Sequence, residues 1–289
     1  MHPTIEQMLS SYPTTNVYDK KNAIKEILQE IILCGLSRAG FFRTAAFYGG
    51  TALRIFYGLD RFSEDLDFSL QQRDEMFHLP DYFPQLEAEL RAYGFSFRAE
   101  TKEKSRSSDI HSAFLKGGTR EHVLLLNPED PAALSISPNE QIKIKFEVDT
   151  NPPDDAVFET RYRLLPIPYE VTLYDASSLF AGKIHAVLCR AWKSRIKGRD
   201  LYDYVFYRSR STPVNLAHLT ARLRQSGFLA EDEILTDAEL EKKLCEKFLS
   251  IDYEQAKNDV LPFIKNPAVL DVWKADFFCA ITKGLTSQP

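Results

Sequence analysis

Apolar residues recur at helical spacing near the N-terminus. Within Asn22–Leu36 they lie three and four residues apart, at Ile24, Ile27, Leu28, Ile31 and Ile32. This spacing predicts an amphipathic helix with one apolar face. Further along the chain the spacing changes to two residues, which is typical of strands with one buried face.

The segment Ser63–Leu70 shows this alternation most clearly. Apolar Leu66, Phe68 and Leu70 fall on one side, and polar Asp65, Asp67 and Ser69 fall on the other. Two carboxylates on one face of a strand repel each other, which costs stability. A bound divalent cation would offset that repulsion, so the pattern predicts a metal-binding strand face.

The longest alternating segment is Gln141–Thr150. Its apolar row is Ile142, Ile144, Phe146 and Val148, and its opposite row is Lys143, Lys145, Glu147 and Asp149. A sheet with one buried face and one face of charged side chains follows from this pattern.

The remaining elements divide the chain into two parts. Before residue 170 we expect helices at Thr51–Tyr57 and Pro84–Tyr93, and strands at Arg43–Tyr48, Phe95–Ala99, His111–Leu115, His122–Leu126 and Arg161–Ile167. After an Asp175 cap we expect helices at Ala176–Arg190, Asp200–Arg208, Leu216–Gln225, Asp237–Leu249, Tyr253–Phe263 and Val269–Lys283. The predicted fold class is α+β. A mixed-sheet α/β domain with flanking helices spans residues 1–170, and a helical domain over 171–289 completes the cleft.

Composition is that of an ordinary globular protein, with 44% apolar and 27% charged residues. The sequence has no apolar run of bilayer-spanning length and no secretion leader at its N-terminus, so we expect a cytoplasmic protein without membrane contact. The four cysteines lie far apart in the sequence and are expected to be reduced. The six histidines lack zinc-site spacing.

The net charge of −5 argues against a surface coated with positive charge. Residues Arg190–Arg199 (RAWKSRIKGR) are nevertheless rich in Lys and Arg and contain no acid. They predict a local positive patch, although a solvated helix face and loop would give the same composition. Residues Lys102–Asp109 form either a solvated loop or a second nucleic-acid contact.

One pattern in the sequence indicates phosphate and metal binding. It consists of a strand, a glycine pair, a helix and a second strand with two acids. Glycines let the backbone approach phosphates closely, and the following helix N-terminus offers N–H donors, so Gly49, Gly50 and Thr51 are candidate phosphate contacts. Asp65 and Asp67 have the spacing to share Mg²⁺ or Mn²⁺ beside a triphosphate, with Glu147 as the candidate third ligand. Lys145 is a candidate nucleotide-binding residue on the strand that carries Glu147.

Three segments in this order resemble the AbiEii/AbiGii toxin family, a branch of the DNA-polymerase-β-like nucleotidyltransferase superfamily. They are FYGGTALRIFYGLDRFSEDLDFSL, KFEVDTNPP and AGKIHAVLCR with KGRDLYDYVF, which together span about residues 40 to 207. The resemblance implies a nucleotidyltransferase-like fold, with Asp65 and Asp67 as metal ligands. Lys183 would contact the triphosphate, and either Asp203 or Asp200 would be a later catalytic acid.

The residues themselves offer support for this assignment and alternatives to it. Lys183 and Arg190 are seven residues apart, which places both on nearly the same helix face, where they could bind phosphates. Lys183 could equally be an ordinary surface lysine. Asp200 could simply cap the start of its helix.

The resemblance also implies a function. It indicates the toxin of a toxin–antitoxin or phage-defence pair, which transfers NMP from an NTP to an RNA acceptor such as the tRNA 3′ end and has a cognate antitoxin protein as partner. A protein-modifying AMP or UMP transferase would use the same site. A catalytically silent NTP-binding regulatory module is a further alternative, although the intact Asp65 and Asp67 pair favours an enzyme.

Overall fold

The computed structural model describes residues 2–13, 16–101, 109–118, 136–190 and 196–288. A seven-stranded sheet runs through it in the order β3-β4-β5-β2-β1-β7-β6. Its strands are β1 (Ala45–Tyr48), β2 (Leu66–Leu70), β3 (Arg98–Thr101), β4 (Ile110–Gly118), β5 (Gln141–Asp149), β6 (Phe158–Arg163) and β7 (Tyr169–Tyr174). Because β2 pairs with β5 in parallel and with β1 in antiparallel orientation, the sheet is mixed. This confirms the predicted α+β fold class.

The chain forms two compact units, and each is built from several stretches of sequence. The first comprises residues 1–51, 64–152 and 160–173, and the second comprises 52–63, 153–159 and 174–289. The chain therefore passes between the units several times. The division at residue 170 stays a prediction.

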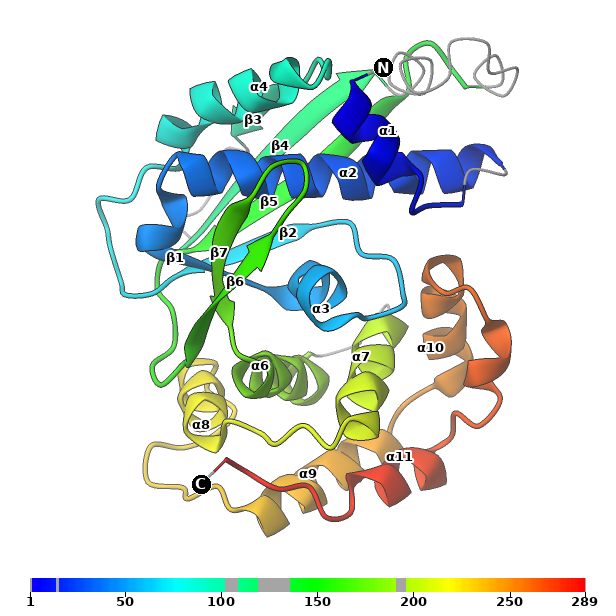
Figure 1. Cartoon of the computed structure of the whole chain (residues 1–289). Coiled ribbons are helices and arrows are strands. Elements are labelled where there is room, and N and C mark those ends of the chain that lie inside the picture. Colours follow the sequence, from blue (N-terminus) through cyan, green and yellow to red (C-terminus); the bar gives the residue numbers. More distant parts are fainter. Residues whose placement is uncertain (1, 14–15, 102–108, 119–135, 191–195, 289) are drawn as a thin grey trace. The chain divides into compact units, whose positions relative to one another are not determined.

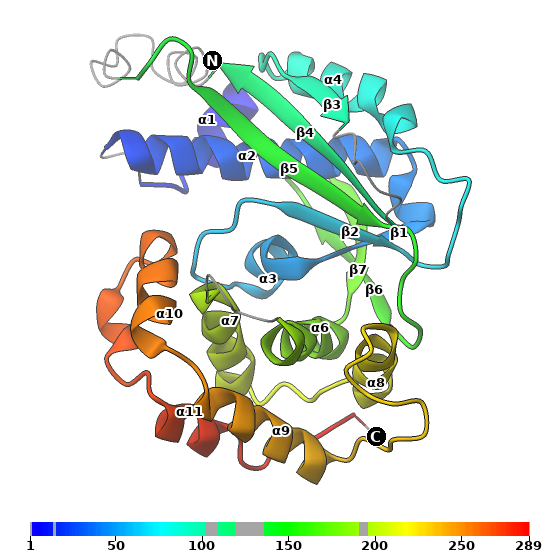
Figure 2. The ribbon, with the colours of Figure 1, turned by 180° about the vertical axis from the view of Figure 1, so that it is seen from behind.

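The first unit is a sheet with helices on one face. Helices α1 (Pro3–Leu9), α2 (Val17–Arg38) and α4 (Phe83–Ala92) lie on the same side of β4 and β5, as the two opposite views show (Figures 1 and 2). The apolar face of α2 and the apolar row of β5 are both buried, as the spacing predicted. Phe68 lies at the centre of an aromatic core, with ring centroids 4.7 Å from Phe146 and 5.0 Å from Phe47.

The charged row of β5 consequently lies on the other face of the sheet. Lys143 is exposed, whereas Lys145, Glu147 and Asp149 are half-buried. In Figure 2 this face of β4 and β5 is toward the viewer. Side chains of chemical interest are thus placed on a rigid strand.

The second unit is mainly helical. Its helices are α6 (Ala176–Cys189), α7 (Gly198–Ser209), α8 (Leu216–Gln225), α9 (Asp237–Leu249), α10 (Tyr253–Val260) and α11 (Ala275–Thr282). Asp175 caps α6 by accepting the Ser178 N–H at 2.8 Å, as predicted. Thr236 and Glu239 form a reciprocal capping box at the start of α9. Within the described residues, no helix is long and apolar enough to cross a membrane.

Some element predictions were wrong. The strand expected at Phe95–Ala99 lies at Arg98–Thr101, because Gly94 adopts φ +88° and the Phe95 N–H closes the end of α4 on the Leu90 carbonyl. The helix expected at Val269–Lys283 is split into a 3₁₀ turn, Pro267–Leu270, and α11. Strand β7 was not predicted. The strand expected at His122–Leu126 lies outside the described residues.

Candidate active site

The sheet register brings Glu147 beside an acidic segment that lies about 80 residues earlier in the sequence. Asp67 on β2 is the direct neighbour of Glu147 on β5, and in a parallel pair such neighbours point to the same face. Asp65 comes one residue before β2 begins and is half-buried, like Asp67 and Glu147. We call Asp65, Asp67 and Glu147 the carboxylate cluster.

A lysine contributes positive charge to the carboxylate cluster. The Lys145 ammonium donates to Glu147 Oε2 at 2.6 Å, and the Ser112 hydroxyl donates to Glu147 Oε1 at 3.0 Å. Partial burial lowers the pKa of Lys145, but the hydrogen bond and charge of Glu147, with the charges of Asp65 and Asp67, outweigh this and raise it. The register of β2 on β5 places Asp67 on the same face of the sheet as Glu147 and Lys145.

Gly49 lies against the carboxylate cluster. It follows the last residue of β1 and begins α3 (Gly49–Tyr57), with φ at +82°. A Cβ atom at this position would lie 2.5 Å from Asp67 Oδ2 and 3.1 Å from Asp67 Cβ. Only glycine combines that backbone conformation with this close approach. The backbone at Gly49 therefore passes close to the Asp67 carboxylate, and α3 starts at Gly49 itself.

Thr51 ties the same turn to the acidic strand. Its side chain is buried, and its hydroxyl donates to the Asp65 backbone carbonyl at 2.5 Å. The start of α3 and the start of β2 are thereby held together. Phosphate contact by Gly49, Gly50 and Thr51 stays a prediction.

Two acids of the carboxylate cluster are candidates to hold a magnesium ion, and this assignment stays a prediction. In the described parts of the chain, no group of three or more His, Cys, Asp or Glu side chains is arranged to hold a metal ion. The Glu147 carboxylate is held instead by Lys145 and Ser112. Asp65 and Asp67 suit Mg²⁺ nonetheless, because this ion commonly takes one or two protein carboxylates and completes its octahedron with phosphates and water. Glu147 as a third ligand stays a prediction.

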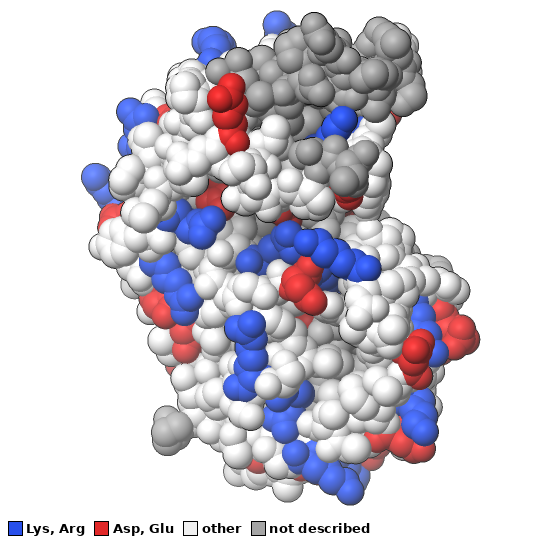
Figure 3. Space-filling view, turned by 45° about the vertical axis from the view of Figure 1, so that its right-hand side comes forward, with Lys and Arg blue, Asp and Glu red and all other residues white. Residues whose placement is uncertain are grey.

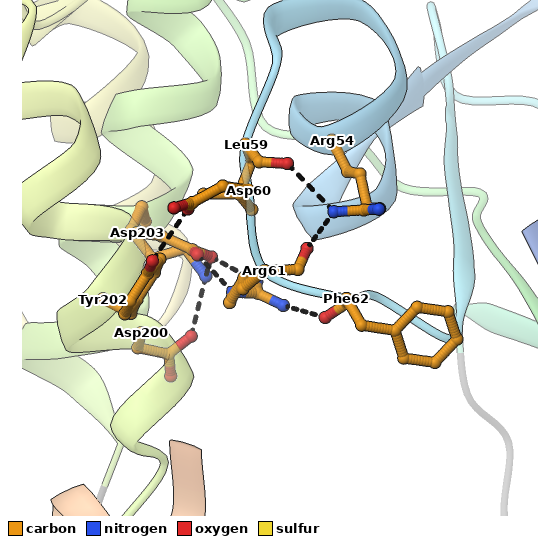
Figure 4. Close-up of polar contacts among 9 residues, drawn as sticks. Arg54, Leu59, Asp60, Arg61, Phe62, Asp200, Tyr202 and Asp203 are labelled. Carbon is orange, nitrogen blue, oxygen red and sulfur yellow. Dashed lines mark hydrogen bonds and ion pairs between the residues drawn. The ribbon is translucent and has the colours of Figure 1, made fainter. Parts of the chain in front are cut away.

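The second unit holds a buried ion-pair network, shown in Figure 4. The guanidinium of Arg61 grips Asp203 with two parallel bonds, Nε–Oδ1 at 2.6 Å and Nη2–Oδ2 at 2.7 Å. The Lys183 ammonium reaches Asp203 at 2.8 Å and Asp200 at 2.7 Å. Arg190 completes the network by pairing with Asp200.

Burial is nearly complete at the centre of this network. Asp203 is 0% exposed and Arg61 is 3% exposed. Burial raises the pKa of Asp203, but the charges of Arg61 and Lys183 outweigh it and lower that pKa, so Asp203 stays ionised. An enclosed, ionised acid positions its cations, and this environment does not favour proton exchange with a substrate. The role of Asp203 as a catalytic acid stays a prediction.

The structure thus brings Lys183, Arg190, Asp200 and Asp203 together within one unit. The capping interpretation of Asp200 was wrong, because Lys197 is the N-cap of α7 and Asp200 binds Lys183 and Arg190. Sequence reasoning missed Arg61. Its signal was a basic residue in DRFSEDLD, directly before the acidic strand.

The predicted basic patch is described only in part. Residues 191–195 lie outside the described residues, and Arg199 places its guanidinium 4.2 Å from the centroid of the Phe263 ring. Of the loop Lys102–Asp109, only Asp109 is described. The described residues therefore do not test whether either segment contacts nucleic acid, and both roles stay predictions.

Comparison with known proteins identifies the family. A family model described as "Nucleotidyl transferase AbiEii toxin, Type IV TA system" matches residues 31–275. The chain belongs to the AbiEii toxin family. This confirms the resemblance stated from the sequence motifs, and the chain is accordingly a nucleotidyltransferase of the toxin class.

A solved structure shares the fold at low identity. The AbiEii-family chain is similar to MenT4, a nucleotidyltransferase toxin from Mycobacterium tuberculosis, with a TM-score of 0.51, 13% identity and coverage of 96% of this chain and 88% of that one. It is also similar to JHP933 from Helicobacter pylori, with a TM-score of 0.47, 16% identity and coverage of 90% and 88%. A search of curated proteins gave no match.

Proposed function

We propose that this AbiEii-family chain is a toxin that transfers NMP from an NTP to an RNA acceptor, with Mg²⁺ or Mn²⁺ bound at Asp65 and Asp67. The observation that carries the proposal is the parallel register that sets Asp67 beside Glu147, with Gly49 packed against Asp67. Acids gathered on one strand face beside a glycine-led helix start are what a metal–triphosphate complex requires.

Each group at the carboxylate cluster has a proposed task. Asp65 and Asp67 would hold the metal, which when bound would neutralise charge developing on the transferring phosphoryl group. The backbone at Gly49 and Gly50 would approach the triphosphate. Lys145 would bind the nucleotide, and its bond to Glu147 keeps the ammonium in place and charged.

The ion-pair network would supply positive charge to the phosphates. Lys183 has a 15% exposed side chain and Arg190 a 44% exposed one, and both are anchored on Asp200. Anchored cations lose less conformational freedom when they bind an anion than flexible ones do. We therefore assign Asp200 and Asp203 to positioning, and Lys183 and Arg190 to nucleotide contact.

RNA is the acceptor that we favour. Despite the net charge of −5, the face drawn in Figure 3 carries many Lys and Arg side chains, with Asp and Glu side chains among them. Local positive charge supports contact with an RNA backbone. The tRNA 3′ end is the specific acceptor proposed, and growth arrest countered by a cognate antitoxin, in a phage-defence setting, is the proposed context.

The test is a labelling reaction. Purified protein is incubated with each α-³²P NTP, Mg²⁺ and cell lysate, and the products are split between RNase and protease treatment. Label lost with RNase supports the proposal. Label lost with protease would establish the protein-modifying transferase, and a complete lack of labelling with every NTP would leave the NTP-binding regulatory module.

A further inference from the structure

A cavity in the second unit lies beside the ion-pair network and has no role in the function proposed above. Its volume is about 350 Å³, toward the lower end of the roughly 300–1,000 Å³ typical of small-ligand sites. Three aromatic side chains, Tyr202, Phe206 and Trp273, line it together with Asp60 and Arg210. The cavity lining thus combines flat aromatic side chains with one carboxylate, Asp60, and one guanidinium, Arg210.

Both charged groups are held in place. The Tyr202 hydroxyl donates to Asp60 Oδ1 at 2.7 Å (Figure 4). Burial, and then this bond, raise the pKa of Tyr202, so its phenol remains a donor. The Arg210 guanidinium lies 4.1 Å from the Phe206 ring centroid and donates to the Tyr57 carbonyl at 2.8 Å. A carboxylate accepts several hydrogen bonds, so Asp60 can accept from a ligand as well as from Tyr202.

This lining suits a nucleobase better than an apolar side chain of a partner protein. An apolar group would cover Asp60 and Arg210 without bonding to either, which costs free energy. A base has a face that stacks on an aromatic ring or a guanidinium plane, and an edge that forms hydrogen bonds. Phe206 and Arg210 provide such planes, and Asp60 provides an acceptor for the edge.

The carboxylate also selects among bases. Adenine, cytosine and guanine each present an exocyclic amino group that can donate to it. The single donor on the pairing edge of uracil lies between two carbonyl oxygens, which a carboxylate repels. We propose that this cavity binds one unstacked, amino-bearing nucleobase of the RNA acceptor. The choice of RNA as the source of that base rests on the proposed function, whereas binding of the base does not require transfer.

The experiment measures binding without catalysis. Full-length protein carrying Asp65→Asn is titrated, in EDTA, into fluorescein-labelled oligoadenylate and oligouridylate of equal length, and anisotropy is recorded. We expect the adenylate to bind about 10-fold more tightly, or more, which is the discrimination that one good base-edge contact gives. Phe206→Leu should weaken adenylate binding by a similar factor, and Asp60→Asn should reduce the preference over uridylate. Asp232→Asn, which changes an exposed carboxylate of the same unit outside the cavity lining, should change neither.

Equal affinity for both oligonucleotides, or an unchanged preference in Asp60→Asn, overturns the proposal. So does RNA binding unaltered by Phe206→Leu in a variant with the parent's melting temperature, because the cavity then serves another ligand. Free AMP should displace the adenylate only at about 100-fold higher concentration, and equal competition would make the free nucleotide the ligand. Failure of the labelling reaction while the adenylate preference persists removes only the proposed function.

Discussion

The carboxylate cluster and the ion-pair network are built from similar residues and have opposite electrostatics. In the cluster, three half-buried acids lie on or beside strands β2 and β5, and Lys145 donates to one of them, Glu147. In the network, two acids are matched by Arg61, Lys183 and Arg190 at the start of α7. The first region is built around carboxylates on a strand face, whereas in the second three cations surround two carboxylates.

We propose that this difference reflects two roles, metal binding by the cluster acids and positioning of cations by the network acids. A like-charge cluster is destabilising until a cation joins it. A buried pair with two parallel bonds has already exchanged its hydration for protein contacts, and removing one partner leaves the other uncompensated. The same acidic residue types are therefore proposed to bind a ligand in the first unit and to position cations in the second.

Changing the cluster acids should have the largest effect on activity. Asp65→Asn and Asp67→Asn each remove a proposed metal ligand, so transfer should fall by more than the roughly 10- to 100-fold that loss of an outer-sphere partner costs. Stability should hold or rise because repulsion is relieved. Labelling rate and melting temperature are the measurements, and retention of normal transfer by both variants would refute the metal assignment.

Changing the network should cost stability. Arg61→Ala leaves the buried Asp203 with Lys183 as its remaining cation in the network, and we expect a loss of up to about 3–5 kcal/mol in the free energy of unfolding. Arg73→Ala breaks an exposed pair with Glu75 and should cost less than about 1 kcal/mol. Urea denaturation of both variants measures the contrast, and equal losses would contradict a structural role for Arg61.

Replacing Gly49 should have a smaller effect on stability and tests whether this residue belongs to the site. Gly49→Ala and Gly227→Ala both place alanine at positive φ, +82° and +70° respectively, for a similar cost of about 1 kcal/mol. Only at Gly49 does the new methyl group meet Asp67, whereas nothing lies within 4 Å of it at Gly227. Transfer should therefore drop in Gly49→Ala alone. Equal activity of the two variants would remove Gly49 from the site.

The last prediction concerns His218, a third kind of buried group, whose effect appears only at acidic pH. Its Nδ1 lies 2.7 Å from the Asp154 carbonyl, and its Nε2 has no hydrogen-bond partner within the described structure. Burial lowers the pKa of His218 to about 4 from 6.5. The unfolded chain therefore binds more protons between pH 6.5 and pH 4, and stability falls as pH falls through that window, by up to about 1.4 kcal/mol per unit.

The variant His218→Asn should flatten this part of the pH dependence of unfolding. Asp203 does not contribute there, because its lowered pKa makes its stabilisation persist until pH falls below the ordinary range of a carboxyl group. An unchanged slope in His218→Asn would assign the pH dependence to other groups.

Local pattern predicted much of this molecule. The alternation in Ser63–Leu70 and Gln141–Thr150 identified the buried faces correctly, because period two is a property of every strand. Helices α8 and α9 have the predicted bounds, since caps and apolar spacing agree there. By contrast, the neighbour relation of Asp67 and Glu147 depends on strand order, which no local pattern contains.

The network shows the same limit more strongly. Arg61 and Asp203 are 142 residues apart in sequence, and neither has a local pattern that selects its partner. The motif containing Asp200 and Asp203 suggested two catalytic acids. Only the three-dimensional structure shows that Asp200 and Asp203 are both bound by cations within one unit.

The interleaved units have a practical consequence for anyone who wishes to divide the protein. Residues 52–63, which carry Arg61, belong to the second unit although the first unit's sequence flanks them on both sides. An N-terminal fragment that ends near residue 152 loses the strand that pairs with β1, and the C-terminal remainder loses the guanidinium that compensates Asp203. No single cleavage point yields two intact halves, so the toxin must be expressed, inactivated and engineered as one piece.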